Sequence, residues 1–595
     1  MRNTCCSLPM LCLLLIVQAA WASDKALDRI LTTEANMIVS VSDISSLREA
    51  FQSHPLVVDF GEVSWEDLMG SFMEEADDET GGFTKLLEEF ELDVDQLFEL
   101  FPGSAGLVVY NIQELIMEDA EQPDIAIIAD FAGTAERLDE LMQIQFERNA
   151  KAQKEMNPEM EHEMIREKFM GETLYFDEAY DGEETYIEDG YALVDGIFIL
   201  AAPEERLRSL VELIKAGPDQ PIGRSSAYRR AYEESGPFDM LFYLNFESFL
   251  PALNKAMMDV AMEGGLALFG VTGKSLDAAL SLDAMQAFSL SCKFHEDSIT
   301  SNSSLVYREK AGLLNLFTYG EGALPAASYV PKGILSSTVA LFDLSEMLAQ
   351  TEALLGAASP STPALIDIQL QKIKTESGVD LRTAVIENFG PELVTYSMLP
   401  DGLAGDEALI ENEQVYVLEI KDSAALSGAL EALKDLIPGS RAQIRTREFE
   451  GETIHSFTAP ADPALTGGSG YEFSFVVSRT HLIISMGRAG LIQGVLTAMQ
   501  SQDSGFWQTD EIEGLIDQFG KPGAVSRSYT DLGKFVGTLM DSIREAGLLA
   551  GSDVQIDSSV MPDDMDLPWH LMTETREASD GIFTRMVMLR KEEAQ

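Results

Sequence analysis

Short β-rich apolar runs alternate with stretches of helical periodicity along the chain. Residues 37–43 form the first such run, and Asp43 or Ser45 follows where it can cap a helix. The helix predicted after Thr134 places four apolar residues on one face, which is the pattern of a helix packed on a sheet. The further strands predicted in the first half are 106–110, 125–130, 191–194, 197–200, 240–244, 288–294 and 299–307.

The order of turns and strands favours antiparallel pairing. Asp195-Gly196 separates two β-rich runs, and this dipeptide is typical of a two-residue type I′ hairpin because both residues tolerate positive φ. A closing hairpin is expected around Asp580-Gly581 in the second half. Consecutive hairpins with interposed helices predict an α+β fold, in which helices cover the face of an antiparallel sheet.

The two halves of the chain repeat one plan. The stretch Phe169-Met170-Gly171-Glu172-Thr173 returns as Phe449-Glu450-Gly451-Glu452-Thr453, about 280 residues later. The surrounding strands and helices recur in the same order, including helices that stop at Pro102-Gly103 and Gly390-Pro391. We therefore predict two tandem copies of an antiparallel sheet with covering helices. Copy one carries a polar extension, residues 149–166, that copy two lacks.

This duplication defines the expected domains. Residues 1–22 are predicted to be a signal peptide, 23–319 the first α+β copy, 320–333 a linker rich in Gly, Pro and Ala, and 334–595 the second α+β copy. A chain of 595 residues is too long for one core, which agrees with this division.

Charge excludes one class of partner. The chain has 100 acidic and 41 basic residues, and its formal net charge of −59 would repel a phosphate backbone. Nucleic acid is therefore not expected as a partner. Such an acidic surface suits salty surroundings, and it also leaves open the collective binding of divalent cations at acidic loops.

The N-terminus indicates export. Arg2, an apolar run over 8–20 and the small residues before Ser23 are the three parts of a secretory signal peptide, with cleavage expected after Ala22. No later stretch is apolar enough for a spanning helix, although an uncleaved N-terminal anchor is the alternative. Three of the four cysteines lie in this segment, so processing leaves only Cys292 and no intrachain disulfide. This pattern is typical of a bacterial periplasmic or secreted protein.

The motifs that suggest chemistry are incomplete. Residues 270–275 resemble a phosphate-binding loop, but its earlier glycine position holds Leu268. The histidines are not at ligand spacing from one another or from Cys292, so no zinc site is predicted. We assign no catalytic residue, cofactor-binding residue or metal ligand from the sequence, and no cofactor. The six histidines are His54, His162, His295, His455, His481 and His570.

Acidic residues offer the remaining candidates. The clusters at 177–189 and 563–566 could hold calcium through carboxylate oxygens, but neither has EF-hand spacing, and solvated loops are the preferred interpretation. Glu172 and Glu452 could be paired acid/base carboxylates. We prefer the simpler account that each lies at a turn or strand edge, where an exposed charge discourages aggregation.

The repeated Phe-x-Gly-Glu-Thr strand, the helix stops and the closing hairpins together resemble an uncharacterised family of large exported bacterial proteins, a domain of unknown function. The resemblance implies an exported envelope or extracellular protein with no established activity. We expect a non-catalytic protein with a binding or scaffolding role. Two alternatives stay open: a carrier of an apolar ligand such as a lipid, hinted at by the Met-rich run 256–262, and a hydrolase whose site is dispersed in sequence.

Overall fold

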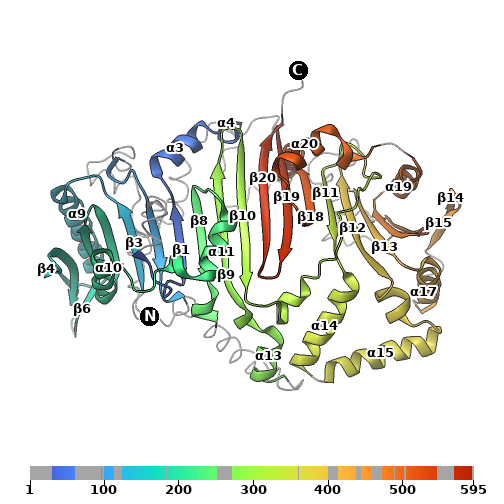
Figure 1. The fold of residues 1–595 in the computed structure, drawn as a ribbon, viewed down its shortest axis with the longest axis horizontal. Coiled ribbons are helices and arrows are strands. Elements are labelled where there is room, and N and C mark those ends of the chain that lie inside the picture. The colour runs from blue at the N-terminus through green and yellow to red at the C-terminus, as the bar shows by residue number, and fades with distance from the viewer. Residues whose placement is uncertain are drawn as a thin grey trace. The chain divides into compact units, whose positions relative to one another are not determined.

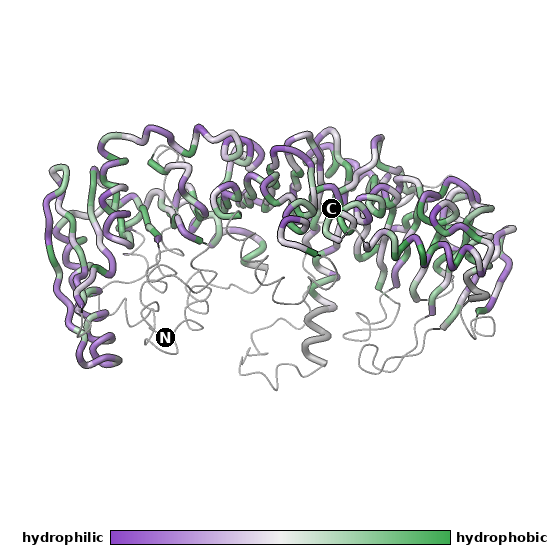
Figure 2. The backbone as a smooth tube through the Cα atoms, turned by 90° about the horizontal axis from the view of Figure 1, so that it is seen from below, coloured by the Kyte–Doolittle hydropathy of each residue, from purple (hydrophilic) through white to green (hydrophobic). Residues whose placement is uncertain are grey.

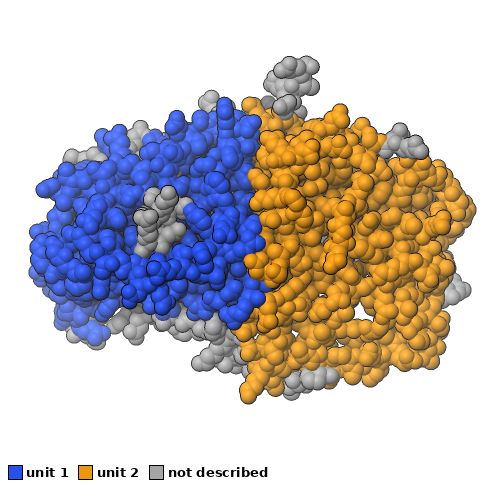
Figure 3. All heavy atoms as spheres, viewed as in Figure 1, with its two compact units in different colours: residues 1–254, 285–308 blue, residues 255–284, 309–595 orange. Residues whose placement is uncertain are grey.

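The chain forms two compact units, which are described separately (Figure 3). Unit 1 consists of residues 1–254 and 285–308, and unit 2 of residues 255–284 and 309–595. The computed structural model describes residues 30–59, 96, 99–112, 124–180, 184–250, 271–359, 361–399, 413–436, 444–458, 472–487, 490–501, 504–545 and 568–591.

Unit 1 is an antiparallel sheet covered by helices (Figure 1). Its described strands are β1 (Met37–Val41), β2 (Ala105–Val109), β3 (Ile125–Asp130), β4 (Glu161–Phe169), β5 (Glu172–Tyr180), β6 (Thr185–Val194), β7 (Ile197–Ala202), β8 (Met240–Asn245), β9 (Met285–Phe294) and β10 (Ser298–Tyr307). Its described helices are α3 (Ile44–Ser53), α4 (Pro55–Asp59), α9 (Ala135–Met156), α10 (Glu204–Ala216), η1 (Ile222–Arg224) and α11 (Ser226–Ser235).

Within this unit the strands pair in the order β10–β9–β8–β1–β2–β3–β7–β6–β5–β4, and every pairing is antiparallel. The α+β fold class is confirmed. Strand β2 lies near the middle of this order and all five of its residues are buried. Such near-continuous burial requires cover on both faces, and it explains why β2 and β3 read as apolar runs rather than as alternating ones.

The two faces of the unit 1 sheet are covered by different helices. Leu107 and Val109 pack in a core with Ile44 of α3 and Leu138 of α9. Val108 points to the opposite face and is also fully buried. Helix α10 packs on β6 and β7, and α11 packs on β9 and β10. The helix caps follow the sequence: the side chain of Asp43 accepts a hydrogen bond from the first turn of α3, and that of Thr134 from the first turn of α9.

Unit 2 is built from the same kinds of elements. Its described strands are β11 (Ser336–Leu341), β12 (Phe389–Met398), β13 (Glu413–Ile420), β14 (Arg445–Phe449), β15 (Glu452–Thr458), β16 (Glu472–Val477), β17 (His481–Met486), β18 (Ala524–Asp531), β19 (Trp569–Ala578) and β20 (Gly581–Arg590). Its described helices are α13 (Gly273–Leu280), η3 (Leu282–Ala284), η4 (Gly312–Leu316), α14 (Leu344–Ala358), α15 (Ser361–Ser377), η5 (Arg382–Ile386), α17 (Ser423–Leu436), α19 (Gly490–Gln500), η7 (Phe506–Gln508), α20 (Asp510–Phe519) and α21 (Leu532–Glu545).

The strand order of unit 2 matches that of unit 1. Its antiparallel pairings run β20–β19–β18–β11–β12–β13–β17–β16–β15–β14. Each described strand of unit 1 therefore has its counterpart ten strands later, in the same place in the order. This correspondence is what the predicted duplication requires, although common descent of the two copies stays a prediction. The compact units differ from the predicted copies at residues 255–284 and 309–319, which belong to unit 2, where α13 packs against α14. The predicted linker at 320–333 belongs to unit 2 as well, and its Ala327 and Val330 are part of the core of that unit.

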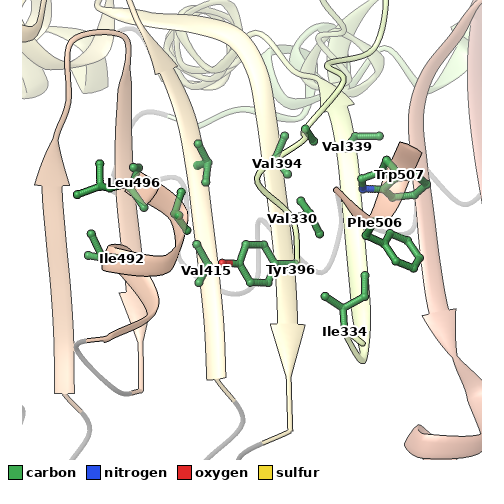
Figure 4. Close-up of a cluster of buried hydrophobic side chains, with 14 of the residues drawn as sticks. Val330, Ile334, Val339, Val394, Tyr396, Val415, Ile492, Leu496, Phe506 and Trp507 are labelled. Atoms are coloured by element: carbon green, nitrogen blue, oxygen red, sulfur yellow. The ribbon is translucent and has the colours of Figure 1, made fainter. Parts of the chain in front are cut away.

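The main core of unit 2 lies between the sheet and its helices α19 and α20 (Figure 4). In Figure 4, Val415 of the sheet lies toward Ile492 of α19, and Val339 lies beside Trp507, and all four residues belong to one cluster. A smaller core on the opposite face joins Leu482 to Leu426 of α17. Figure 2 shows hydrophobic and hydrophilic positions interspersed along the backbone.

The repeated Phe-x-Gly-Glu-Thr stretch is a hairpin turn in both units. Met170 and Gly171 adopt φ values of 50° and 91°, and Glu450 and Gly451 adopt 53° and 88°. These values are typical of a type I′ turn, which matches the twist of the strands that it joins. The prediction of a single strand over this stretch is wrong, because the phenylalanine ends one strand and the glutamate begins the next. The predicted position of Glu172 and Glu452 at a turn or strand edge is confirmed.

Most predicted strands are present, with differences at charged segments. The hairpin at Asp195-Gly196 is confirmed, with φ values of 51° and 84°. The closing turn of unit 2 lies one residue earlier than predicted, because Gly581 already begins β20 and pairs with Ala578. The polar extension at 149–166 is the end of α9 and the start of β4, and neither β4 nor β14 was predicted.

Several expectations fall on residues that the structure does not describe. They are the signal peptide at 1–22, the Met-rich run at 256–262 and the acidic cluster at 563–566. Within the described ranges, no helix combines the length and the apolar character needed to cross a membrane.

Candidate metal centre

Three neighbouring strands of unit 1 bring three possible metal ligands together. His162 lies on β4, Asp177 on β5 and Glu188 on β6, and one ligand atom from each lies within 4.8 Å of the others. These strands form successive antiparallel pairs, with β4 last in the pairing order of the unit. Residues far apart in the sequence are therefore held together by backbone hydrogen bonds.

A β-bulge explains why the acids converge. Phe176 pairs with Gly190 and Glu178 pairs with Ile187, so Asp177 alone stands opposite both Glu188 and Asp189. A bulge of this kind places two residues against one and re-aims their side chains. Regular pairing would alternate Glu188 and Asp189 between the two faces of the sheet, away from a common partner.

Gly190 is required beside this bulge. A Cβ atom at this position would lie 2.7 Å from the carbonyl oxygen of Tyr175 and would also press on the ring of Phe176. We predict that Gly190→Ala destabilises unit 1 by about 1–3 kcal/mol, the usual cost of overpacking. Urea denaturation measures the loss.

The control for this prediction is Gly428→Ala. Gly428 lies within α17, and no heavy atom is found within 4 Å of its hypothetical Cβ. That change should stabilise the protein by about 0.5–1 kcal/mol, because alanine is the better helix residue. Equal stability of Gly190→Ala and the wild type would contradict the assignment of a crowded bulge.

His162 is the most deeply buried member of the cluster. Its side chain is 1% exposed, and its Nδ1 lies 2.8 Å from Oδ1 of Asp177, whose side chain is 7% exposed. The Nε2 atom is buried and has no hydrogen-bond partner among the described residues. Burial lowers the pKa of His162, but the hydrogen bond to Asp177 and the neighbouring carboxylates outweigh this effect, and the net shift is upward. An orphaned buried nitrogen beside carboxylates marks this cluster as a possible ligand site.

The two acids of the bulge are electrostatically strained. Burial, followed by repulsion from Asp177, raises the pKa of Glu188. Burial, with repulsion from Asp177 and Glu188, raises the pKa of Asp189 to about 8. Raised carboxyl pKa values mean that the ionised forms are disfavoured in the fold. A bound cation would favour the ionised forms and relieve this repulsion.

Helix α9 supports the cluster from the side of the core. The side-chain amide of Gln153 donates a 2.9 Å hydrogen bond to Oε2 of Glu188. The ring of Phe146 packs edge-on against the ring of His162, with ring centroids 6.4 Å apart. An amide donor and an aromatic wall orient the glutamate and the imidazole. Outer contacts of this kind hold ligands in place in metal sites.

The sequence predicts part of this cluster but not the site. The prediction of a solvated loop at 177–189 is wrong for Asp177, Glu188 and Asp189, which lie on strands, and Asp177 is buried. The ligands are too far apart in the sequence for their spacing to indicate a metal site. The signal that could have pointed here is a histidine in one charged segment, His162, followed later by two acids before a glycine, Glu188 and Asp189 before Gly190. This signal is weak without the pairing register.

Among the described residues of unit 2, no such cluster is found at the corresponding place. Counting eight residues from the phenylalanine of the shared turn reaches Asp177 in unit 1 and Phe457 in unit 2. Phe457 stacks on Phe473 of the next strand, with ring centroids 5.4 Å apart. The same fold is therefore completed by an apolar contact in one unit and by ionisable groups in the other.

The other candidates have structural roles. Glu172 forms an ion pair with Lys215 at 2.6 Å, and Glu452 begins β15 after the turn, where burial raises its pKa. Residues 271–275 of the glycine-rich stretch begin α13, with Thr272 and Ser275 forming a capping box. Burial raises the pKa of Cys292 on β9 to about 11, as for an inert core thiol.

A second ionisable cluster lies in unit 2. The hydroxyl of Tyr529 shares a hydrogen bond with Nδ1 of His570, whereas the buried Nε2 lies 3.1 Å from Oε1 of Glu511 but makes no hydrogen bond among the described residues. Asp531 accepts two 3.0 Å hydrogen bonds from Lys591. Among the described residues, no three possible ligand atoms of this cluster come as close together as those around His162, so we interpret it as a buried polar network rather than as a ligand site.

His570 gives a prediction about acid stability. Burial, then the charge of Lys591, lowers its pKa below the ordinary value, against the opposing effects of Glu511 and Asp531. Below about pH 6.5 the unfolded chain therefore binds a proton that the folded chain resists, and stability falls with pH. The free energy of unfolding of His570→Asn should decline less steeply than that of the wild type between pH 6.5 and 5, whereas His295→Asn, at an exposed turn, should follow the wild type. Parallel slopes for all three proteins would refute this.

Comparison with known proteins gives no family assignment. No protein-family model matches the chain, and no curated protein matches it. Two solved structures of TP0453, crystal forms I and III, align with 46% of this chain at 10% and 9% identity, covering 82% and 84% of their own chains, each with a TM-score of 0.22. A score this low carries no argument about this protein, so membership of the uncharacterised exported family stays a prediction.

Proposed function

We propose that the protein is an exported, non-catalytic binding protein that holds a divalent cation at the His162–Asp177–Glu188 cluster. The observation that carries this proposal is the convergence of one imidazole and two carboxylates within 4.8 Å on three adjacent strands. Imidazole and carboxylate groups are common ligands of divalent cations in proteins.

Electrostatics supports binding rather than a purely structural role. Burial first, and then repulsion between neighbouring carboxylates, raises the pKa of Glu188 and of Asp189. Apolar residues often replace buried charges without loss of stability, and in unit 2 the position that corresponds to Asp177 holds Phe457, which stacks on Phe473. The charged cluster therefore has a cost to the fold, and that cost is offset when a cation binds.

The test is a metal titration of the full chain after chelator treatment. Calorimetry and thermal melts with Zn²⁺, Mn²⁺ and Ca²⁺ at equal ionic strength should show binding of at least one ion by the wild type. A ligand at 100 times its Kd stabilises the fold by about 2.7 kcal/mol. His162→Asn should reduce this gain and His295→Asn should not. Absence of binding by every ion, or equal binding by both variants, would overturn the proposal.

Export and the lack of catalysis are further parts of the proposal. The charged, apolar and small-residue order of residues 1–22 supports a cleaved signal peptide. Mass spectrometry of the exported protein should find Ser23 at the N-terminus. A product that begins at Met1 in the membrane would favour the anchored form, and turnover in a hydrolase panel would favour the enzyme alternative.

One observation favours the carrier of an apolar ligand as a second candidate. Leu290 on β9 is 45% exposed and Met240 on β8 is 39% exposed, and Leu290 pairs with Phe242 on that neighbouring strand. The rings of Phe242 and Phe288 pack edge-on on the same face of the sheet, with ring centroids 6.2 Å apart. Lipid extraction of the purified protein tests this candidate, since a carrier should retain stoichiometric lipid and Leu290→Glu should lose it.

A further inference from the structure

We infer that the His162 cluster is selective for a transition-metal dication of the Zn²⁺ class, and that it discriminates against Ca²⁺ and Mg²⁺. This inference rests on the proposed cation-binding function and adds to it the chemical class of the ion. It follows from the donor atoms and from the burial of the cluster.

The imidazole is the first reason. Ca²⁺ and Mg²⁺ are hard cations that bind oxygen, whereas imidazole nitrogen suits Zn²⁺ and other first-row transition metals. His162 is held between its hydrogen bond to Asp177 and the edge contact with Phe146. Its side chain is 1% exposed, so it cannot move aside to leave an all-oxygen site without opening the strand pair. Any ion that enters the cluster therefore meets a nitrogen donor.

The number of donors is the second reason. Ca²⁺ requires six to eight oxygen ligands, part of which are usually waters. Here Asp177 and Glu188 supply the carboxylates, with Asp189 beside them on the bulge, and the side chains of His162 and Asp177 are almost completely buried. Zn²⁺ is satisfied by four ligands, of which three come from the protein in an open site. Three protein donors with little access for water match the smaller coordination number.

The fold itself does not require these residues. Unit 2 completes the same three-strand arrangement, β14–β15–β16, with Phe457 in the place of Asp177. In the part of the chain that the structure describes, this ligand set is found in unit 1. We expect one ion per chain, held where β4, β5 and β6 meet.

The test compares affinities on the chelator-treated full chain. Competition titrations with Zn²⁺, Co²⁺, Ca²⁺ and Mg²⁺ should give one site whose affinity for Zn²⁺ exceeds that for Ca²⁺ by more than about 10- to 100-fold, the range over which outer contacts alone tune metal affinity. Bound Co²⁺ should show the intense visible absorption of a four- or five-coordinate site with a nitrogen donor. His162→Asn should weaken Zn²⁺ binding by at least that factor and abolish this spectrum, while His295→Asn should change neither.

The outcomes separate this inference from the proposed function. Tight Zn²⁺ binding that depends on His162, with weak Ca²⁺ binding, supports the inference. Binding of Ca²⁺ as tight as that of Zn²⁺, or insensitivity of both to His162→Asn together with sensitivity to Glu188→Gln, would overturn the inference and leave cation binding standing. No binding of any ion would overturn both. Circular dichroism and urea denaturation of each variant identify any loss of binding that comes from unfolding.

Discussion

The substitution Glu188→Gln is expected to leave the metal-free protein at least as stable as the wild type and to remove most of its stabilisation by metal. Burial and the repulsion of Asp177 raise the pKa of Glu188, which means that its charge opposes folding at neutral pH. Glutamine removes this charge and keeps an oxygen that can accept the hydrogen bond from Gln153. A structural residue would behave in the opposite way, since its loss would destabilise the protein with or without metal.

The magnitude follows from ligand linkage. At a metal concentration 100 times the wild-type Kd, the wild type should gain about 2.7 kcal/mol. A variant that binds about 100-fold more weakly should gain about 0.4 kcal/mol at the same concentration. Urea denaturation with and without metal measures both quantities, and Asp297→Asn, in the exposed turn between β9 and β10, is the matched control for loss of one negative charge. Equal metal gains for Glu188→Gln and the wild type would show that Glu188 is not a ligand.

The substitution Trp507→Ala is expected to cost unit 2 about 3–5 kcal/mol, the usual range for removing a large aromatic side chain from a core. Trp507 is 6% exposed and packs edge-on against Phe506, with ring centroids 5.4 Å apart. Its indole N–H donates a 3.0 Å hydrogen bond to the hydroxyl of Ser337 on β11. Alanine would leave a cavity in the core, and the hydroxyl of Ser337 would lose the hydrogen bond from the indole.

Leu365→Ala is the control for this prediction. Leu365 lies on α15 and is 59% exposed, so its truncation should change stability by less than about 0.5 kcal/mol. Chemical denaturation followed by circular dichroism measures the free energy of unfolding of both variants. If the two units unfold in separate transitions, the transition that Trp507→Ala shifts to lower denaturant concentration belongs to unit 2. A loss below about 1 kcal/mol for Trp507→Ala would contradict the core assignment.

The sequence predicts those elements whose stabilising pattern is local. Asp195-Gly196 specifies its hairpin because the turn conformation depends on two adjacent residues. The cap at Asp43 and the start of a helix after Thr134 were predicted for the same reason, since the signals of a helix start lie within one helical turn. The two units share one strand order, and the sequence indicates this because similar local patterns return in the same order along the chain.

The elements that were missed depend on distant neighbours. Strand β4 has the sequence Glu-His-Glu-Met-Ile-Arg-Glu-Lys-Phe, and its charged residues hide it from a search for apolar alternation. Among the described strands of unit 1 it pairs only with β5, and charge on such a strand discourages pairing with other chains. The sequence therefore predicts a single polar extension at 149–166, where the structure has the end of α9 followed by the start of β4. Pairing with a neighbour, rather than local propensity, makes this segment a strand.

The candidate site could not be predicted from sequence for a related reason. His162, Asp177 and Glu188 are separated by 15 and 11 positions, and only the register of two hairpins brings them together. The bulge adds a second condition, because a shift of one residue in β6 would turn Glu188 to the other face. Acid-rich composition hinted at cations in general, but the buried imidazole that argues for a transition metal appears only in three dimensions.

Anomalous diffraction from crystals grown with Zn²⁺ tests the central claim most directly. A single anomalous peak is predicted in unit 1, about 2.0–2.2 Å from a nitrogen of His162 and from carboxylate oxygens of Asp177 and Glu188, as in other zinc sites. Crystals of Glu188→Gln grown in the same way should lack this peak. Peaks confined to other carboxylates, or an empty cluster at a saturating Zn²⁺ concentration, would contradict the account.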